Sequence, residues 1–161
     1  MNKEQEVYKA LEKHDIPYTT HQHPAVYTVK EAEQFTSHIE GTHTKNIFLR
    51  NKKGDTHYLV ILPAQKRLDL KQLAQQLKES KLSFASPERL KEYLGLTPGS
   101  VSPLGLIYNK EKNAKVILDK ELLEAQKIGF HPNVNTATIV ITVEDFKKFL
   151  SALGYSFTTI S

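Results

Sequence analysis

The chain has 161 residues, of which 39% are hydrophobic and 25% are charged, a composition typical of a globular protein rather than a disordered or fibrous one. It contains no cysteine, which excludes disulfides, thiolate metal sites and a cysteine nucleophile. No stretch approaches the roughly 20 apolar residues of a membrane span, and the polar N-terminus resembles neither a signal nor a transit peptide. We therefore expect one cytoplasmic domain, residues 1–161, with no membrane partner.

Basic side chains are clustered in the middle of the sequence. Lys and Arg number 22 against 18 Asp and Glu, so the net charge is +4 with neutral His. Such an excess favours an anionic partner such as a phosphate backbone, although a merely solubilising surface explains the charge alone equally well. The clustered residues are Lys45, Arg50, Lys52, Lys53, Lys66, Arg67, Lys71, Lys78 and Lys81.

Hydrophobic spacing predicts the elements of the first part of the chain. Helical periodicity over 3–14 is followed by a short strand over 16–21 and by a helix that Thr28 caps. Two neighbouring core strands come next. One begins at Lys45, and the other is the apolar run 58–62, which is typical of a strand buried on both faces.

Helices and strands mix irregularly in the rest of the chain. A helix capped by Asp69, a short strand over 82–84 and a helix from Ser86 to Gly95 lead into a turn-rich loop, 97–103. The pattern then predicts strands over 106–108 and 116–118, a short helix over 122–126, a strand over 136–142, a helix after Thr142 and an edge strand over 155–160. Without a strict βαβ alternation, we expect an α+β fold with a mixed, mostly antiparallel sheet flanked by helices.

Two histidines, His21 and His23, would share one face of a strand and suggest a metal site. No third ligand stands at a recognised zinc spacing, and no His-Glu-x-x-His motif occurs. We therefore expect no metal. Neither a P-loop nor a dinucleotide or Gly-x-Ser-x-Gly motif is present.

Three polar segments are hard to explain as scaffold alone. They are Lys45-Asn46 at the head of a strand, the loop Gly99–Pro103, and the turn Gly129–Thr136, which contains His131, Asn133 and Asn135. Each could be ordinary surface or turn chemistry. Loops that hold rigid polar groups at strand ends are also where binding sites concentrate.

Taken together, these segments resemble the YbaK/ProX family of prolyl-tRNA editing domains, which are related to the insertion domain of bacterial prolyl-tRNA synthetase. The resemblance rests on Lys45-Asn46-Ile-Phe-Leu after Gly41, the Gly-x-x-x-Pro loop at 99–103, His131-Pro132-Asn133 before a Thr-rich strand, and the early segment 23–32. It covers essentially the whole chain in the family's order. It implies a trans-acting aminoacyl-tRNA deacylase with the insertion-domain fold and with neither metal nor nucleotide cofactor.

Asn46 and the His-Pro-Asn segment resemble the branch that hydrolyses alanyl-tRNA(Pro). Two alternatives stay open, a deacylase for another small acyl group (Cys or Ser) and a non-catalytic module that binds the tRNA acceptor end. The partners implied are the acceptor end of aminoacyl-tRNA(Pro) and, transiently, prolyl-tRNA synthetase.

The resemblance also assigns roles to individual residues. Lys45, Gly99 and His131 are the expected catalytic residues: Lys45 for the terminal phosphate or the oxyanion, Gly99 for close approach of the loop amides to the carbonyl, and His131 for the α-amino group or a water, or else for fixing its own loop. The expected substrate-binding residues are Val26, Thr28, Val29, Asn46, Ser100, Val101, Ser102, Pro103, Phe130, Pro132 and Asn133.

Overall fold

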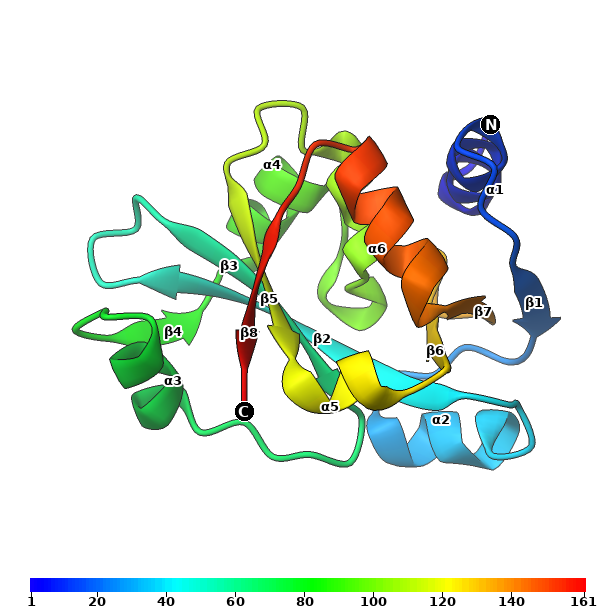
Figure 1. Ribbon diagram of the computed structural model, residues 1–161, viewed down its shortest axis with the longest axis horizontal. Coiled ribbons are helices and arrows are strands. Elements are labelled where there is room, and N and C mark those ends of the chain that lie inside the picture. Colours follow the sequence, from blue (N-terminus) through cyan, green and yellow to red (C-terminus); the bar gives the residue numbers. More distant parts are fainter.

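A long strand, β2 (Thr42–Asn51), joins the two parts of an eight-stranded sheet in the computed structural model, which describes residues 1–161 (Figure 1). The strand order is β1-β7-β6-β2-β3-β5-β8, and β4 pairs with the end of β2. Four strand pairs are antiparallel and three are parallel, which confirms the predicted mixed, mostly antiparallel sheet. The other strands are β1 (Thr19–Gln22), β3 (His57–Pro63), β4 (Leu82–Phe84), β5 (Ala114–Asp119), β6 (Lys127–Phe130), β7 (Ala137–Thr142) and β8 (Phe157–Ile160).

Six α-helices and two 3₁₀ helices flank the sheet. They are α1 (Lys3–Lys13), α2 (Val29–Thr36), α3 (Leu70–Gln76), α4 (Pro87–Leu94), α5 (Lys120–Glu124), α6 (Val143–Ala152), η1 (Pro98–Ser100) and η2 (Pro103–Tyr108). The predicted caps Thr28, Asp69, Ser86 and Thr142 each accept a backbone N–H from the first turn of their helix, which confirms these helix starts. None of the helices is long and apolar enough to cross a membrane.

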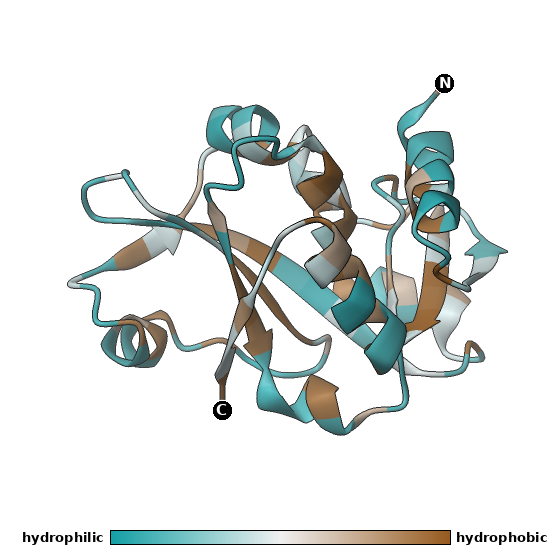
Figure 2. Cartoon of the chain, turned by 45° about the horizontal axis from the view of Figure 1, so that its top comes forward, coloured by the Kyte–Doolittle hydropathy of each residue, from teal (hydrophilic) through white to brown (hydrophobic).

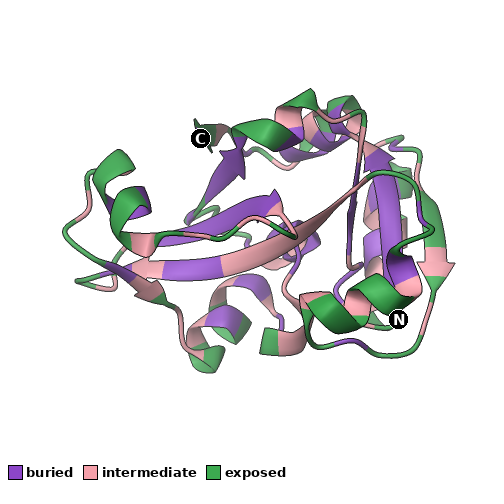
Figure 3. Ribbon diagram, turned by 90° about the horizontal axis from the view of Figure 1, so that it is seen from below, coloured by how far each residue is buried: buried purple, intermediate pink, exposed green.

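The apolar face of each element packs into one of two hydrophobic clusters. The larger gathers side chains of α1, α4, α6 and η2 with Phe48, Leu59 and Ile61, whereas the smaller joins α3 to Leu49 and Val60. β3 is buried along all but its last residue, as its apolar run predicted. β2 differs, because it is hydrophilic at its start, apolar in its middle and hydrophilic again at its end (Figure 2), and its first six residues are only half-buried (Figure 3).

The sheet opens beside the first part of β2. On one side β2 pairs with β6 only at Thr42 and His43, and pairing with β4 begins only at Leu49. Between these points that edge of β2 is free of strand partners, and α2 lies beside the start of β2 (Figure 1). Strand edges that are free and half-buried leave room for a ligand, so this opening positions the site.

The structure differs from the prediction at two elements, one predicted as the wrong type and one not predicted. Residues 106–108, expected as a strand, belong to the 3₁₀ helix η2, because Ser102 and Pro103 start a helical turn that continues through the apolar residues. The four-residue strand β6 was not predicted, since its Gly129 lies in a stretch that has the composition of a turn. The short helix expected over 122–126 occurs at α5, two residues earlier.

Candidate active site

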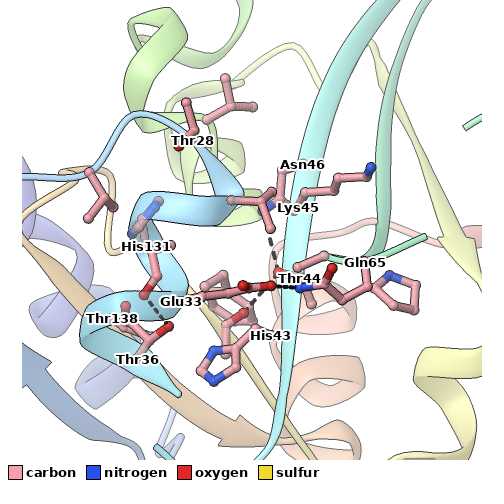
Figure 4. A pocket seen from close by; sticks show the side chains of 18 of the residues that line it. Thr28, Glu33, Thr36, His43, Thr44, Lys45, Asn46, Gln65, His131 and Thr138 are labelled. Carbon is pink, nitrogen blue, oxygen red and sulfur yellow. Dashed lines mark hydrogen bonds between the residues drawn. The ribbon is translucent and has the colours of Figure 1, made fainter. Parts of the chain in front are cut away.

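A cavity of about 340 Å³ lies in the opening between β2 and β6. It is bounded by α2 and the segment before it, by the first half of β2 and the last residue of β3, by the 98–101 loop, and by β6 and β7 (Figure 4). Its lining residues are Val26, Tyr27, Thr28, Val29, Ala32, Glu33, Thr36, Ser37, Thr42, His43, Thr44, Lys45, Asn46, Pro63, Ala64, Gln65, Pro98, Gly99, Val101, Gly129, Phe130, His131 and Thr138. Its size is that of a small-molecule site.

The structure brings all three predicted catalytic residues to this cavity. Lys45 lies in β2, Gly99 in η1 and His131 directly after β6, so the three come from parts of the chain that are far apart in the sequence. Six of the predicted binding residues join them there: Val26, Thr28, Val29, Asn46, Val101 and Phe130.

Lys45 and Asn46 point to opposite faces of β2, because successive side chains in a strand alternate. In Figure 4 the Lys45 side chain extends across the β2 ribbon, away from His131. Its ammonium group forms no hydrogen bond or ion pair with the protein. Lys45 is therefore an unpaired positive charge at the rim of the cavity rather than at its floor.

Two polar atoms of the cavity are buried without a hydrogen-bond partner, Asn46 Oδ1 and His43 Nε2. The Asn46 amide nitrogen lies 3.5 Å from Thr44 Oγ1, and Thr44 in turn donates to the Gly129 carbonyl oxygen at 2.9 Å across the β2–β6 opening. Buried polar groups are normally satisfied. These two atoms are thus available to a water or to a ligand.

His131 is held in one tautomer. Its Nδ1 lies 2.9 Å from the Ala137 carbonyl oxygen, which can only accept, so Nδ1 donates and Nε2 of the neutral ring keeps its lone pair. Burial lowers the pKa of His131, His23 lowers it further, and the Ala137 carbonyl opposes the shift. The ring is therefore neutral at pH 7 and can accept a hydrogen bond.

His23 packs beside His131, with 6.2 Å between the ring centroids. Its Nε2 is 2.8 Å from Thr138 Oγ1 and its Nδ1 is 2.9 Å from the Pro24 carbonyl oxygen. Its Nε2 thus anchors the segment before α2 to β7, whereas its Nδ1 bond stays within that segment. Nowhere in the chain do three or more His, Asp or Glu side chains gather as a metal site would require.

The 97–103 loop contributes backbone as well as side chains. The Ser100 amide donates to the Thr97 carbonyl oxygen at 3.0 Å, whereas the Gly99 amide has no partner. The backbone at Gly99 does not have a positive φ; instead a Cβ there would lie 3.1 Å from a ring carbon of Tyr27. A side chain at position 99 would therefore make the Tyr27 ring shift by a few tenths of an ångström.

Five predicted binding residues do not line the cavity. Ser102 and Pro103 are buried at the start of η2, where Ser102 Oγ accepts the Leu104 amide at 3.1 Å. Asn133 is only 2% exposed and has φ +62°, a left-handed conformation that Asn tolerates. Pro132 is buried and Ser100 is half-buried beside the cavity. The structure therefore separates these residues from the predicted site, and their binding roles stay predictions.

Sequence reasoning missed several lining residues that the fold brings in. Glu33 and Thr36 come from α2, Ser37 directly follows that helix, and Gln65 follows β3. Glu33 accepts a hydrogen bond from Gln65 across the cavity mouth (Figure 4). The period of α2 could have suggested one face of that helix, but the proximity of Gln65 depends on tertiary structure alone.

Comparison with known proteins identifies the family. The model of the aminoacyl-tRNA editing domain matches residues 23–149. The chain belongs to the aminoacyl-tRNA editing domain family. This confirms the resemblance found in the sequence, and with it the predicted class of enzyme, an aminoacyl-tRNA deacylase.

Relatives of this editing domain cover nearly its whole length. The prolyl-tRNA editing protein ProX of Acetoanaerobium sticklandii is 39% identical over 160 residues, covering 99% of this chain and 98% of that protein. The mouse prolyl-tRNA synthetase associated domain-containing protein 1 is 34% identical, with coverage of 83% and 81%. The crystal structure of a proposed trans-editing enzyme for prolyl tRNA synthetase shares the fold, with TM-score 0.73, 24% identity and coverage of 99% and 96%.

Proposed function

We propose that this editing domain hydrolyses the ester of mischarged tRNA(Pro) in trans, with alanyl-tRNA(Pro) as its main substrate. The observation that carries the proposal is the opening between β2 and β6, which gathers Lys45, His131 and the Gly99 amide around one cavity. The names of the similar proteins, a prolyl-tRNA editing protein and a prolyl-tRNA synthetase associated protein, support tRNA(Pro) as the carrier.

Ester hydrolysis needs little more than positioning. The bond joins an aminoacyl carbonyl to a ribose hydroxyl, so a held water and a donor for the developing oxyanion are enough, without a covalent nucleophile. The free Gly99 amide is the available donor at the cavity wall. Water adds to the carbonyl carbon, and the ribose oxygen leaves with a proton. In this scheme the vicinal ribose hydroxyl of the substrate relays the proton, because it accepts a proton from the attacking water and donates its own to the departing ribose oxygen.

The α-ammonium group of the substrate requires acceptors. His131 Nε2 carries a free lone pair because Nδ1 is committed to Ala137. Glu33 is the one carboxylate that lines the cavity. These two groups orient the aminoacyl group; because His131 Nε2 has a single lone pair, it accepts from either the α-ammonium group or the water, not from both.

In this scheme the Lys45 ammonium group binds the phosphate of the terminal nucleotide. Its ammonium group has no acidic partner and extends to the outer side of β2, away from His131. A charge at the rim suits an anion that stays in solvent contact. The same placement argues against the alternative of a direct oxyanion contact.

Selection by size would act where the acyl side chain meets the wall of the cavity. The whole cavity exceeds an alanyl group, so it holds part of the nucleoside as well. At Gly129, a Cβ built on the glycine would be in ordinary van der Waals contact, 3.4 Å from His43 Nδ1 and 3.6 Å from Thr138 Cγ2, so the cavity wall is close-packed there. In this proposal the alanyl side chain lies against this wall. A pyrrolidine ring in the same place would press on His43 and Thr138, which disfavours correctly charged tRNA(Pro).

A synthetase pocket that fits proline still admits alanine, because each missing methylene weakens binding by only about 1–3 kcal/mol. A second site that selects by size is therefore needed to remove the error. Transient association with prolyl-tRNA synthetase would place the editing domain where the error is made. The mouse relative's name supports such a partnership.

The test is a panel of tRNA(Pro) charged with Ala, Cys or Ser and incubated with the purified protein, scored by release of labelled amino acid. We expect Ala to be released fastest. Faster release of Cys or Ser would reassign the acyl group. Tight binding of all three charged tRNAs without ester loss would contradict hydrolysis and leave a binding module.

A further inference from the structure

Tyr27 is an exposed aromatic ring at the edge of the cavity. It is 71% exposed, and the other strongly exposed large apolar side chains of the chain are Met1 and Phe84. Met1 is the first residue, and Phe84 pairs with Leu49, well along β2 from the cavity residues Thr42–Asn46. Tyr27 is therefore the exposed aromatic residue that the fold places at the site.

The backbone around Tyr27 is anchored on both sides. Val26 donates its amide to the Asn135 carbonyl oxygen at 3.2 Å and accepts from Asn135 Nδ2 at 2.9 Å. Thr28 caps α2 by accepting the Glu31 amide at 3.1 Å. The ring thus projects from a segment with fixed ends.

One edge of the ring rests against the 98–101 loop. A Cβ built on Gly99 would lie 3.1 Å from Tyr27 Cδ1 and 3.3 Å from Cε1, so the ring packs directly over the glycine. The phenol hydroxyl forms no hydrogen bond with the protein. Most of an aromatic surface is therefore held in place and left uncovered at the cavity mouth.

We infer that Tyr27 is the stacking platform for the base of the terminal nucleoside of the substrate. This inference rests on the proposed function. The acyl group enters the cavity past Gly99, so the attached nucleoside lies at the mouth, where Tyr27 lines the cavity and leaves most of its side chain exposed. Exposed aromatic rings recognise unpaired bases by stacking, which any base satisfies. The 3′-terminal base of a tRNA is unpaired, and its stacking fixes the ester over the loop.

Binding is tested with a non-hydrolysable analogue, adenosine carrying an amide-linked alanyl group at its 3′ position. We expect Tyr27→Ala to weaken binding about 10- to 100-fold, Tyr27→Phe to bind like the wild type, and Phe84→Ala to serve as an unaffected exposed-aromatic control. A base-free analogue, the alanylamino sugar, should bind equally weakly to all four proteins. Equal affinity of Tyr27→Ala and wild type for the adenosine analogue would overturn the inference.

A spectroscopic version uses the absence of tryptophan in the chain. Tyr27→Trp keeps a stacking face and introduces a single reporter. Titration with the adenosine analogue should quench its fluorescence, whereas the base-free analogue should not. Unchanged emission at saturating adenosine analogue would contradict contact between base and ring.

Gly99→Ala gives a further test, because the added methyl would press on the ring while the backbone amide is kept. We expect Gly99→Ala to weaken analogue binding in the wild type but not in the Tyr27→Ala background. Equal losses in both backgrounds would show that Gly99 acts independently of the ring. Ester release from alanyl-tRNA is scored separately, so loss of stacking with retained hydrolysis and loss of hydrolysis with retained stacking are distinguishable outcomes.

Discussion

At the scale of single residues, Lys45 combines an unpaired ammonium group with a place at the cavity rim. Most surface ion pairs contribute little, but a charge-assisted contact to a bound phosphate is worth roughly 3 kcal/mol. Such a contact is available here because no carboxylate of the protein engages Lys45.

We therefore predict that Lys45→Ala reduces kcat/KM for deacylation by about 10²-fold. Lys9→Ala is the matched control, since Lys9 is exposed on α1, away from the cavity. Single-turnover release of labelled alanine measures both. Wild-type rates for Lys45→Ala would remove Lys45 from the reaction.

A second residue, His57, makes the stability of the folded protein depend on pH. It is 1% exposed, its ring lies 4.0 Å from that of Tyr93, and its Nε2 accepts from Arg89 Nη1 at 3.0 Å. Burial, together with the nearby Arg89 and Arg50 charges, lowers the pKa of His57 to about 4, with only Asp55 opposing. His57 is therefore neutral in the folded protein at pH 7.

Because the unfolded chain has the ordinary His pKa of about 6.5, it takes up the proton first on acidification. The stability that neutral His57 contributes is complete above pH 6.5 and is lost as the pH falls toward about 4. We predict a loss of about 2 kcal/mol between pH 7 and pH 5 from this residue. His57→Gln keeps an acceptor for Arg89 but does not titrate. Between pH 7 and pH 5, the free energy of unfolding of this variant, measured with urea, should therefore fall by about 2 kcal/mol less than that of the wild type. Parallel pH profiles for the two proteins would contradict the assignment.

At the scale of elements, the helix starts were predictable because each capping residue acts on amides two or three positions ahead in the sequence. Thr28, Asp69, Ser86 and Thr142 all cap as the sequence indicated. Strand β6 and helix η2 were not predictable in the same way. β6 is short, and it forms because β7 and the start of β2 supply its partners.

Ser102, in the 99–103 loop, has a structural role as the cap of η2. It was expected to bind substrate, but the structure buries it completely as the cap of η2. We predict that Ser102→Ala lowers the free energy of unfolding by about 1 kcal/mol. Thermal unfolding measures the loss, and deacylation well below the melting temperature should stay at the wild-type rate.

Ser100→Ala is the control for Ser102→Ala, because the Ser100 side chain caps no helix. It should melt like the wild type. If Ser102→Ala were stable but inactive, the substrate-binding role suggested by the sequence would stand instead.

At the scale of the whole molecule, the site exists because the two parts of the sheet separate along the first half of β2. The sequence identified Lys45, the Gly99 loop and His131 through the family they resemble, and the fold brings all three to one cavity. Of the α2 wall, Val29 was predicted, whereas Gln65 could not be, since its place beside Glu33 depends on how α2 packs across the opening.

The central claim is that the cavity accepts an alanyl group against its close-packed wall at Gly129 and disfavours a pyrrolidine ring there. The most direct measurement compares single-turnover hydrolysis of alanyl-tRNA(Pro) and prolyl-tRNA(Pro) with enzyme in excess. We predict that the alanyl ester is cleaved at least about 10²-fold faster, because the larger group would press on His43 and Thr138. Equal rates, or faster loss of proline, would contradict the account.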